Sequence, residues 1–328
     1  MMKGMIAGVR KYFSAVRDLA VAENVNPYTL FADCLYSFLR YGCVLNQYID
    51  GRFYTKSSFL RKRILTYRQW SRIVSTYNDR AYVHFLQNKV DFNSFFQDDI
   101  GRDWLYSRKM TQSQFEAFAQ RHRNMIVKPI SDWEGNGIRR VALSDDKSEL
   151  NHLFLTFKKE DLLLEEEVVQ HPSMVFGNKS VNTIRVYTVY DDTAHEAFVF
   201  KTTLRAGVGE AIVDNSHTGG QAYEVDIETG VVDSRSWSHR APGLLVHPGT
   251  DIIMPGVRIP FWTEVLDLCK KAAGQLHQVR YIGWDVAIKE DGPILIEGNH
   301  DPDLDLVEFV GGSGYLPVIM KHLKNSKI

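Results

Sequence analysis

The chain has 328 residues, of which 44% are hydrophobic and 24% are charged, and its formal net charge is −1. This composition is typical of a soluble globular protein, and the length fits one to three domains. No stretch approaches the ~18 apolar residues of a membrane span, and Lys3 and Arg10 interrupt any signal-peptide core. Three widely spaced cysteines, Cys34, Cys43 and Cys269, form no paired motif, which favours the reducing cytoplasm.

Charge is unevenly distributed, because residues 1–90 hold 14 Lys and Arg against 5 Asp and Glu. Apolar residues recur at helical spacing from Ile6 to Leu19, while Arg10, Lys11 and Arg17 occupy the other face. A solvated basic face is the simplest interpretation. The alternative is a basic surface that contacts the anionic inner face of the membrane. The apolar side of this helix would then lie on lipid, or it packs on the rest of the domain. No feature predicts nucleic-acid binding, and no oligomeric state is predicted.

Two further helices are expected in this basic N-terminal region, residues 1–78. Asn26-Pro27 predicts the start of the second helix, as an N-cap followed by a proline in the first turn. The third helix is expected from Ser57 to Tyr77. The predicted core face of the second helix consists of Leu30, Phe31, Cys34, Leu35, Phe38 and Leu39.

After Asn78 the pattern changes to shorter elements. Short helices and loops are expected over residues 89–104, and a helix is expected over 111–122. From Met125 strands are expected to dominate through residue 235, with 181–189 paired to 197–204, and an amphipathic helix follows over 261–278. Helices mixed with antiparallel strands, without regular β-α-β alternation, favour an α+β fold.

Two segments suggest a nucleotide site. The β-prone run 125–129 places Lys128 before a loop that contains Gly135 and Gly137, and backbone N–H groups of such a loop can bind phosphates. The run Leu162-Leu-Leu is followed by acidic residues, which suits a hinge that contacts adenine through its backbone and ribose through a carboxylate. The expected hinge residues are Glu165, Glu166, Glu167 and Val168. Lys89 is a second candidate phosphate ligand, with an exposed helix residue as the alternative.

A hairpin near the C-terminus suggests a metal site. Asp291-Gly292 predicts its turn, between apolar runs 281–288 and 293–296. Asp285 lies inside the first run, where a buried carboxylate must be paired or coordinated. Glu297 and Asn299 follow the second run, two positions apart and therefore on one face of the strand. Oxygen ligands of this kind suit Mg²⁺ bound together with substrate phosphates; a hairpin with polar ends is the alternative.

The order of these segments resembles the ATP-grasp fold and, more narrowly, the sugar-transfer-associated ATP-grasp family. The resemblance covers roughly residues 26–320. It rests on Lys128-Pro129 with its glycine loop, the Leu-Leu-Glu-Glu hinge, the Asn88–Phe96 and Gly101–Trp104 segments, Val181–Val186, Asp214–Gly220 and the Gly283–Asn299 hairpin. It implies that two α+β subdomains, residues 79–168 and 169–328, enclose ATP between them.

The resemblance also implies chemistry. A carboxylate–amine ligase of this kind forms an acylphosphate from ATP, and an amine then displaces phosphate. Asp285, Glu297 and Asn299 would hold Mg²⁺, or Mn²⁺ in its place, and Arg185 and Arg205 would stabilise the transferring group. The alternative for the arginines is a cross-strand ion pair on the surface. The family name suggests a sugar acid and an amine co-substrate in surface-polysaccharide assembly; a kinase on the same fold and a nucleotide-binding protein without turnover are the competing hypotheses.

Overall fold

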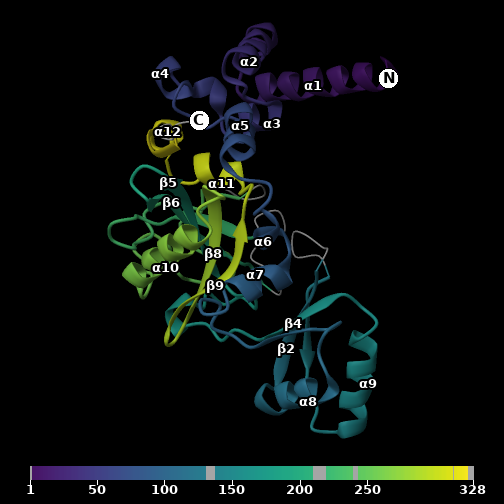
Figure 1. Ribbon diagram of the computed structural model, residues 1–328. Helices are drawn as coiled ribbons and strands as arrows, with labels where there is room; N and C mark the ends of the chain where they lie inside the picture. The colour runs from purple at the N-terminus through teal and green to yellow at the C-terminus, as the bar shows by residue number, and fades with distance from the viewer. Residues whose placement is uncertain (1, 131–136, 210–218, 239–242, 313, 324–328) are drawn as a thin grey trace.

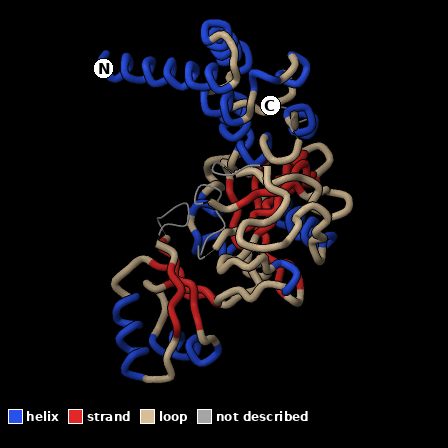
Figure 2. Tube along the Cα trace, turned by 180° about the vertical axis from the view of Figure 1, so that it is seen from behind, coloured by secondary structure: helices blue, strands red, loops and turns tan. Residues whose placement is uncertain are grey.

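The computed structural model describes residues 2–130, 137–209, 219–238, 243–312 and 314–323. Helices from the N-terminal part of the chain lie at one end, a larger antiparallel sheet lies in the middle, and a smaller antiparallel sheet lies at the other end (Figures 1 and 2). The fold is therefore α+β, as expected. Within the described residues, no helix combines the length and apolar character needed to cross a membrane.

The N-terminal helices surround a small core of their own. Val16 and Ala20 of the first helix pack against Leu30 and Cys34 of the second. The elements are α1 (Met2–Ala22), α2 (Pro27–Tyr41), α3 (Leu45–Asp50), the 3₁₀ helix η1 (Phe53–Thr55), α4 (Ser58–Arg61) and α5 (Tyr67–Tyr77). Asn26 caps α2 through its side chain, as predicted, and Gly42 ends the helix in the left-handed conformation.

Two expectations for this region are wrong. The single helix predicted over 57–77 is divided into α4 and α5, because Thr66 starts a new helix in a capping box with Gln69. Immediately before it, the backbone N–H of Leu65 donates to the carboxylate of Glu308, a contact that no local pattern reveals. The core stripe of α2 also differs from the prediction: Leu35 and Leu39 are 47% and 63% exposed. The buried residues of α2 are Leu30, Cys34, Ser37 and Tyr41.

The larger sheet has the strand order β7-β6-β5-β8-β9, and every adjacent pair is antiparallel. Helix α10 packs on one face, and α12 contacts β5 and β6. The predicted pairing of 181–189 with 197–204 and the hairpin around Asp291-Gly292 are confirmed. The elements are α6 (His84–Gln87), α7 (Lys89–Phe95), η2 (Pro172–Met174), β5 (Thr183–Asp191), β6 (Glu196–Ala206), β7 (Gln221–Glu224), α10 (Trp262–Gln275), β8 (Tyr281–Lys289), β9 (Gly292–Asn299), α11 (Leu304–Glu308) and α12 (Leu316–Leu323).

The smaller sheet has the order β1-β4-β2-β3 and packs against two helices around Phe115, Met125 and Leu164. Its elements are β1 (Trp104–Tyr106), α8 (Gln112–Arg121), β2 (Asn124–Pro129), β3 (Arg139–Ala142), α9 (Lys147–Phe157) and β4 (Leu162–Glu166). Strands dominate from Met125 to residue 235 among the described residues, as expected, and α9 is a helix among them that was not predicted. Its signals are local, because Asp146 caps the helix. Its apolar residues 150, 153, 154 and 157 follow helical spacing.

Candidate active site

Three neighbouring strands bring the predicted metal and arginine residues together. Asp285 on β8 lies opposite Glu297 on β9 and opposite Arg185 on β5. The β8–β9 register shifts next to Asp285. Arg205, near the end of β6, also reaches the carboxylate of Asp285. At Gly283 a Cβ would meet Pro302 and the side chain of Arg185, so glycine leaves the space that this arginine occupies.

Asp285 is buried, and two arginines neutralise it. Its carboxylate accepts hydrogen bonds from Nε of Arg185, from Nη2 of Arg185 at 2.9 Å and from Nη1 of Arg205 at 2.8 Å. Burial alone would raise the pKa of this carboxyl, but the charges of Arg185 and Arg205 outweigh burial and hold the pKa well below its ordinary value. Arg185 therefore does form a cross-strand ion pair, which was the alternative to a functional role, but the pair is buried in the sheet and does not lie on the surface.

Glu297 and Asn299 differ from Asp285 because they retain exposed surface. The Nδ2 of Asn299 donates to Oε1 of Glu297 at 3.3 Å. Neighbouring protein atoms displace water from the carboxyl of Glu297, and this desolvation together with the negative charge of Asp285 raises the pKa of Glu297 above its ordinary value. The three predicted metal ligands thus form one buried, neutralised carboxylate and two accessible oxygen donors.

The predicted nucleotide lysines lie together at the end of β2. The ammonium of Lys128 is 2.5 Å from Oε2 of Glu165. Lys89, at the start of α7, donates from Nζ to the carbonyl of Pro129 at 3.1 Å and lies 3.5 Å from that of Ile130. Gly135 lies outside the described residues, whereas Gly137 has a φ of 72°, which suits glycine.

The three adjacent glutamates have different environments. Glu165 is buried and accepts hydrogen bonds from Arg102 and Asn93, so it does not face solvent or an open ribose pocket. Burial opposes its charge, but Arg102 and Lys128 lower its pKa well below the ordinary value. Glu167 pairs with Arg140 at 2.8 Å. Glu166 and Val168 are partly exposed, and both remain candidates for contact with the nucleotide.

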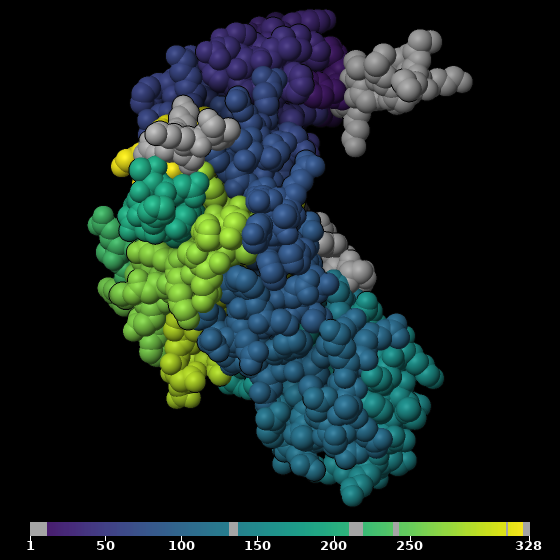
Figure 3. Space-filling model, viewed as in Figure 1, coloured from purple at the N-terminus to yellow at the C-terminus, as the bar shows by residue number. Residues whose placement is uncertain are grey.

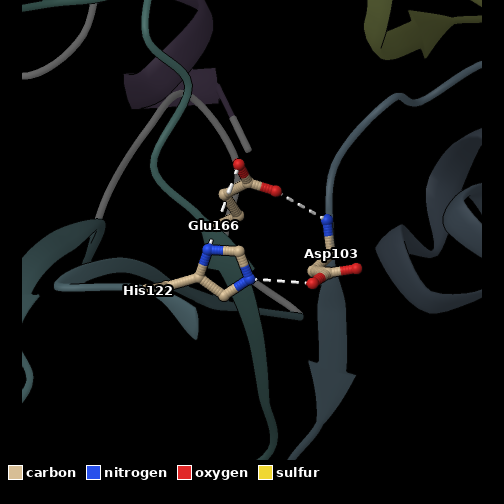
Figure 4. Close-up of side chains that lie close together, drawn as sticks. All are labelled: Asp103, His122 and Glu166. Atoms are coloured by element: carbon tan, nitrogen blue, oxygen red, sulfur yellow. Dashed lines mark hydrogen bonds and ion pairs between the residues drawn. The ribbon is translucent and has the colours of Figure 1, made fainter. Parts of the chain in front are cut away.

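Glu166 also belongs to a group of titratable side chains with His122 and Asp103 (Figure 4). The Nε2 of His122 lies 2.8 Å from Asp103, whereas its Nδ1 lies 4.0 Å from Glu166. Glu166 also accepts from the backbone N–H of Asp103 at 3.0 Å. One ligand atom from each of the three residues lies within 4.8 Å of the others, but the two ring nitrogens of His122 already face the two carboxylates, so the contacts among the side chains explain the arrangement without an ion.

Arg102 is a site residue that the sequence-based assignment did not include. Its guanidinium contacts Glu165 and also donates to the carbonyls of Leu295 at 2.6 Å and Ile296 at 3.2 Å. These carbonyls directly precede Glu297 on β9. One buried side chain therefore connects the smaller sheet, which carries Lys128, to the β8–β9 hairpin, which carries the predicted metal ligands. The Gly101–Trp104 segment was part of the family resemblance, and that was the available signal for this residue.

Comparisons with known proteins give a family and several similar folds. The family model described as "Sugar-transfer associated ATP-grasp" matches residues 68–325. The ATP-grasp ligase PsnB, complexed with minimal precursor, Mg and ADP, is 15% identical over 76% of this chain and 61% of its own, with a TM-score of 0.45. The ADP complex of N5-carboxyaminoimidazole ribonucleotide synthetase is 12% identical over 66% of this chain and 45% of its own, with a TM-score of 0.41.

A third structure is the D-alanine–D-alanine ligase from Bacillus anthracis complexed with ATP. It is 15% identical over 66% of this chain and 57% of its own, with a TM-score of 0.38. The chain thus spans between 45% and 61% of the lengths of these three structures. No curated protein matches the sequence.

Proposed function

Because the chain belongs to the sugar-transfer associated ATP-grasp family, we propose that it is an ATP-dependent ligase that joins a carboxylate to an amine. The observation that carries this proposal is the meeting of Arg185 and Arg205 with Glu297 and Asn299 at one part of the larger sheet. The two guanidinium groups balance the carboxylates of Asp285 and Glu297, so a bound metal ion would supply the positive surplus at this place. Guanidinium groups beside accessible metal ligands suit the transfer of a phosphoryl group.

ATP would lie between residues 79–168 and 169–328. The two lysines would bind its phosphates, with Glu165 orienting Lys128 through their ion pair. The carboxylate of Glu166 or Glu167 would contact ribose, and the backbone at Val168 would contact adenine. Residues that would surround the nucleotide are therefore Lys89, Lys128, Gly135, Gly137, Glu165, Glu166, Glu167 and Val168.

The residues at the hairpin fit Mg²⁺, or Mn²⁺ in its place. Glu297 and Asn299 offer accessible oxygens, and Mg²⁺ characteristically uses one or two carboxylates together with substrate phosphates. Asp285 has about four lone-pair sites. The two arginines use three of them, and the carboxyl of Glu297 lies within hydrogen-bonding reach of Asp285, so the two carboxyl groups are close enough to share one ion. When bound, the ion would neutralise phosphate charge and align the transfer.

The reaction would proceed in two steps. A carboxylate oxygen attacks the γ-phosphorus of ATP, the bond to the bridging oxygen breaks, and ADP leaves. The amine nitrogen then attacks the acyl carbon, phosphate leaves with the electrons of the C–O bond, and the amine loses a proton. Arg185, assisted by Arg205, stabilises the negative charge on the transferring group.

The family description supports a substrate connected with sugar transfer. We assign the carboxylate to a sugar acid of a surface polysaccharide, as a glycan or a smaller precursor, and the amine to an amino acid or related compound in the cytoplasm. A kinase that phosphorylates a sugar hydroxyl would use the same nucleotide residues, and a protein that binds ATP without turnover would need no acceptor. The experiment must therefore distinguish these outcomes.

The test incubates the protein with Mg·ATP, candidate uronic-acid glycans and an amino-acid mixture, with mass spectrometry of the products. A parallel reaction contains hydroxylamine, which converts an acylphosphate into a hydroxamate, and Glu297→Gln serves as the inactive control. We expect ADP, free phosphate and amide in equal amounts. A phosphorylated sugar without free phosphate would instead identify a kinase, and ATP binding without any product would exclude the ligase for these substrates.

A further inference from the structure

Helix α2 is apolar on two opposite sides, and folding accounts for only one of them. The inner side carries Leu30, Cys34, Ser37 and Tyr41, which are buried in the N-terminal core. We define the outer face of α2 as Tyr28, Ala32, Leu35, Tyr36 and Leu39. Residues 28, 32, 35 and 39 repeat at intervals of four, three and four, so they form a stripe directly opposite the buried one.

The outer face is strongly exposed. Tyr28 is 75% exposed, Tyr36 54% and Leu39 63%. A surface helix normally presents polar residues on the side away from the core, and a contiguous apolar patch usually marks an interaction site. The N-terminal helices form the end of the molecule remote from the smaller sheet (Figure 3), so a partner on α2 would leave that sheet accessible.

The charges around the outer face are basic. Arg40 is exposed at the last turn of α2. Arg68 on α5 donates to the carbonyls of Phe38 and Leu39 and lies 5.8 Å from the Phe38 ring centroid. Arg72 follows one turn later on α5 and is exposed. The only acidic residue of α2, Asp33, is already paired with Arg61.

From these observations we propose that the outer face of α2 docks on an anionic lipid surface. Leu35 and Leu39 would enter the interfacial layer of the bilayer, tyrosine rings suit the boundary between headgroups and acyl chains, and the arginines would contact lipid phosphates. A second copy of the chain fits less well, because it would bring two basic rims together. The proposal is independent of the ligase chemistry, because it concerns none of the nucleotide or metal residues.

For α1, contact with lipid and packing on the domain were both left open, and the structure shows packing on the domain at Val16 and Ala20. Val16 and Ala20 of α1 are buried against α2, and Phe13 contacts Phe31 with its rings 5.2 Å apart. Ile6 and Val9 have side chains outside the described residues. Deleting α1 would therefore open the N-terminal core, so the lipid test should use substitutions on the exposed face of α2.

The test is cosedimentation of the full chain with phosphatidylcholine vesicles that contain about 30% phosphatidylserine, and with neutral vesicles, at low and high salt. One variant combines Tyr28→Gln, Leu35→Gln and Leu39→Gln, since glutamine preserves helix propensity. A second combines Arg40→Gln with Arg72→Gln. The matched control is Leu155→Gln on α9, which removes a leucine that is 51% exposed. Circular dichroism and the thermal shift with Mg·ATP monitor folding.

We expect salt-sensitive binding to the anionic vesicles only, unchanged by the control. The triple variant should bind at least about tenfold more weakly. Each arginine near the surface contributes a factor of about five, so the double variant should bind about 25-fold more weakly. Wild-type binding in either folded variant would overturn the proposal. Absence of vesicle binding, together with a dimer that the triple variant dissociates in light scattering, would show that the face joins two copies and would equally overturn it.

Discussion

Asp285 and Glu297 face each other across β8 and β9, yet we expect loss of the Asp285 charge to destabilise the fold and loss of the Glu297 charge to leave its stability nearly unchanged. Asp285→Asn would remove the charge that neutralises Arg185, whose side chain is only 6% exposed. Removing one partner of a buried ion pair typically costs 3–5 kcal/mol, because the other charge stays buried without compensation. Since asparagine keeps one oxygen acceptor for the guanidinium, we expect a loss of about 3 kcal/mol in the free energy of unfolding.

Glu297→Gln should behave differently. Glu297 retains exposed surface, and the fold raises its pKa through surrounding atoms and the charge of Asp285, so the folded protein disfavours its ionised form. A neutral side chain of the same size should therefore change the free energy of unfolding by at most about 0.5 kcal/mol. ATP turnover should nevertheless be almost abolished, because the substitution removes the charge that we propose holds Mg²⁺.

The assay is urea unfolding followed by far-UV circular dichroism, without nucleotide or metal, together with a separate measurement of ATP turnover. Asp291→Asn is the matched control, because that carboxylate lies in the hairpin turn with 79% of its side chain exposed. Equal destabilisation by Asp285→Asn and Glu297→Gln would refute the reasoning. So would an Asp285→Asn protein that unfolds like the wild type.

The difference in free energy of unfolding between wild type and Asp285→Asn should depend on pH in a defined direction. The folded protein lowers the pKa of Asp285, so the stability that this charge contributes is complete above its unfolded pKa of about 3.9. That contribution is lost as pH falls toward the lower pKa of the folded state. The difference between wild type and Asp285→Asn should therefore be constant near neutral pH and shrink below that value.

Two further predictions concern the lysine-bearing sheet. Mg·ATP should raise the thermal midpoint of the wild type, with about 2.7 kcal/mol of stabilisation at 100-fold saturation; Lys128→Ala should lose most of this shift, whereas the exposed Lys109→Ala should keep it. A wild type without any shift at millimolar Mg·ATP would contradict the nucleotide assignment. Arg102→Met should reduce the free energy of unfolding by about 3 kcal/mol and also weaken the ATP-induced shift, as measured by urea unfolding and thermal denaturation; an unchanged shift would show that Arg102 supports the fold alone.

Local patterns predicted those elements whose causes are local. The β8–β9 hairpin follows from two apolar runs and Asp291-Gly292, and the start of α2 follows from Asn26-Pro27. Helix α9 was also readable, from its cap at Asp146 and its apolar spacing, although the surrounding β-prone runs favoured strands. By contrast, the break between α4 and α5 coincides with a hydrogen bond from the backbone N–H of Leu65 to Glu308. The spacing of residues in the sequence cannot predict a contact between positions so far apart.

In the candidate site, too, the sequence predicts features with local causes but not contacts between distant residues. The sequence indicated that Asp285 needed a partner, because a buried carboxylate is costly. It could not identify that partner, since the pairing with Arg185 depends on the register of two strands whose residues are 100 positions apart. The acidic hinge was equally ambiguous, because three adjacent glutamates look alike in sequence. Only the fold shows that Glu165 is buried between Arg102 and Lys128.

Arg102 shows why the two halves of the site should be considered together. Its guanidinium neutralises Glu165, and Glu165 in turn holds the ammonium of Lys128. The same guanidinium binds the two β9 carbonyls that precede Glu297. A phosphate-binding lysine and a metal-binding carboxylate would thus be positioned by one buried cation across two sheets. A buried charge is costly unless its donors are satisfied, and Arg102 also donates to the carbonyl of Ile100 at 3.0 Å and to the side chain of Asn93 at 3.5 Å. These contacts fix the guanidinium between the two sheets.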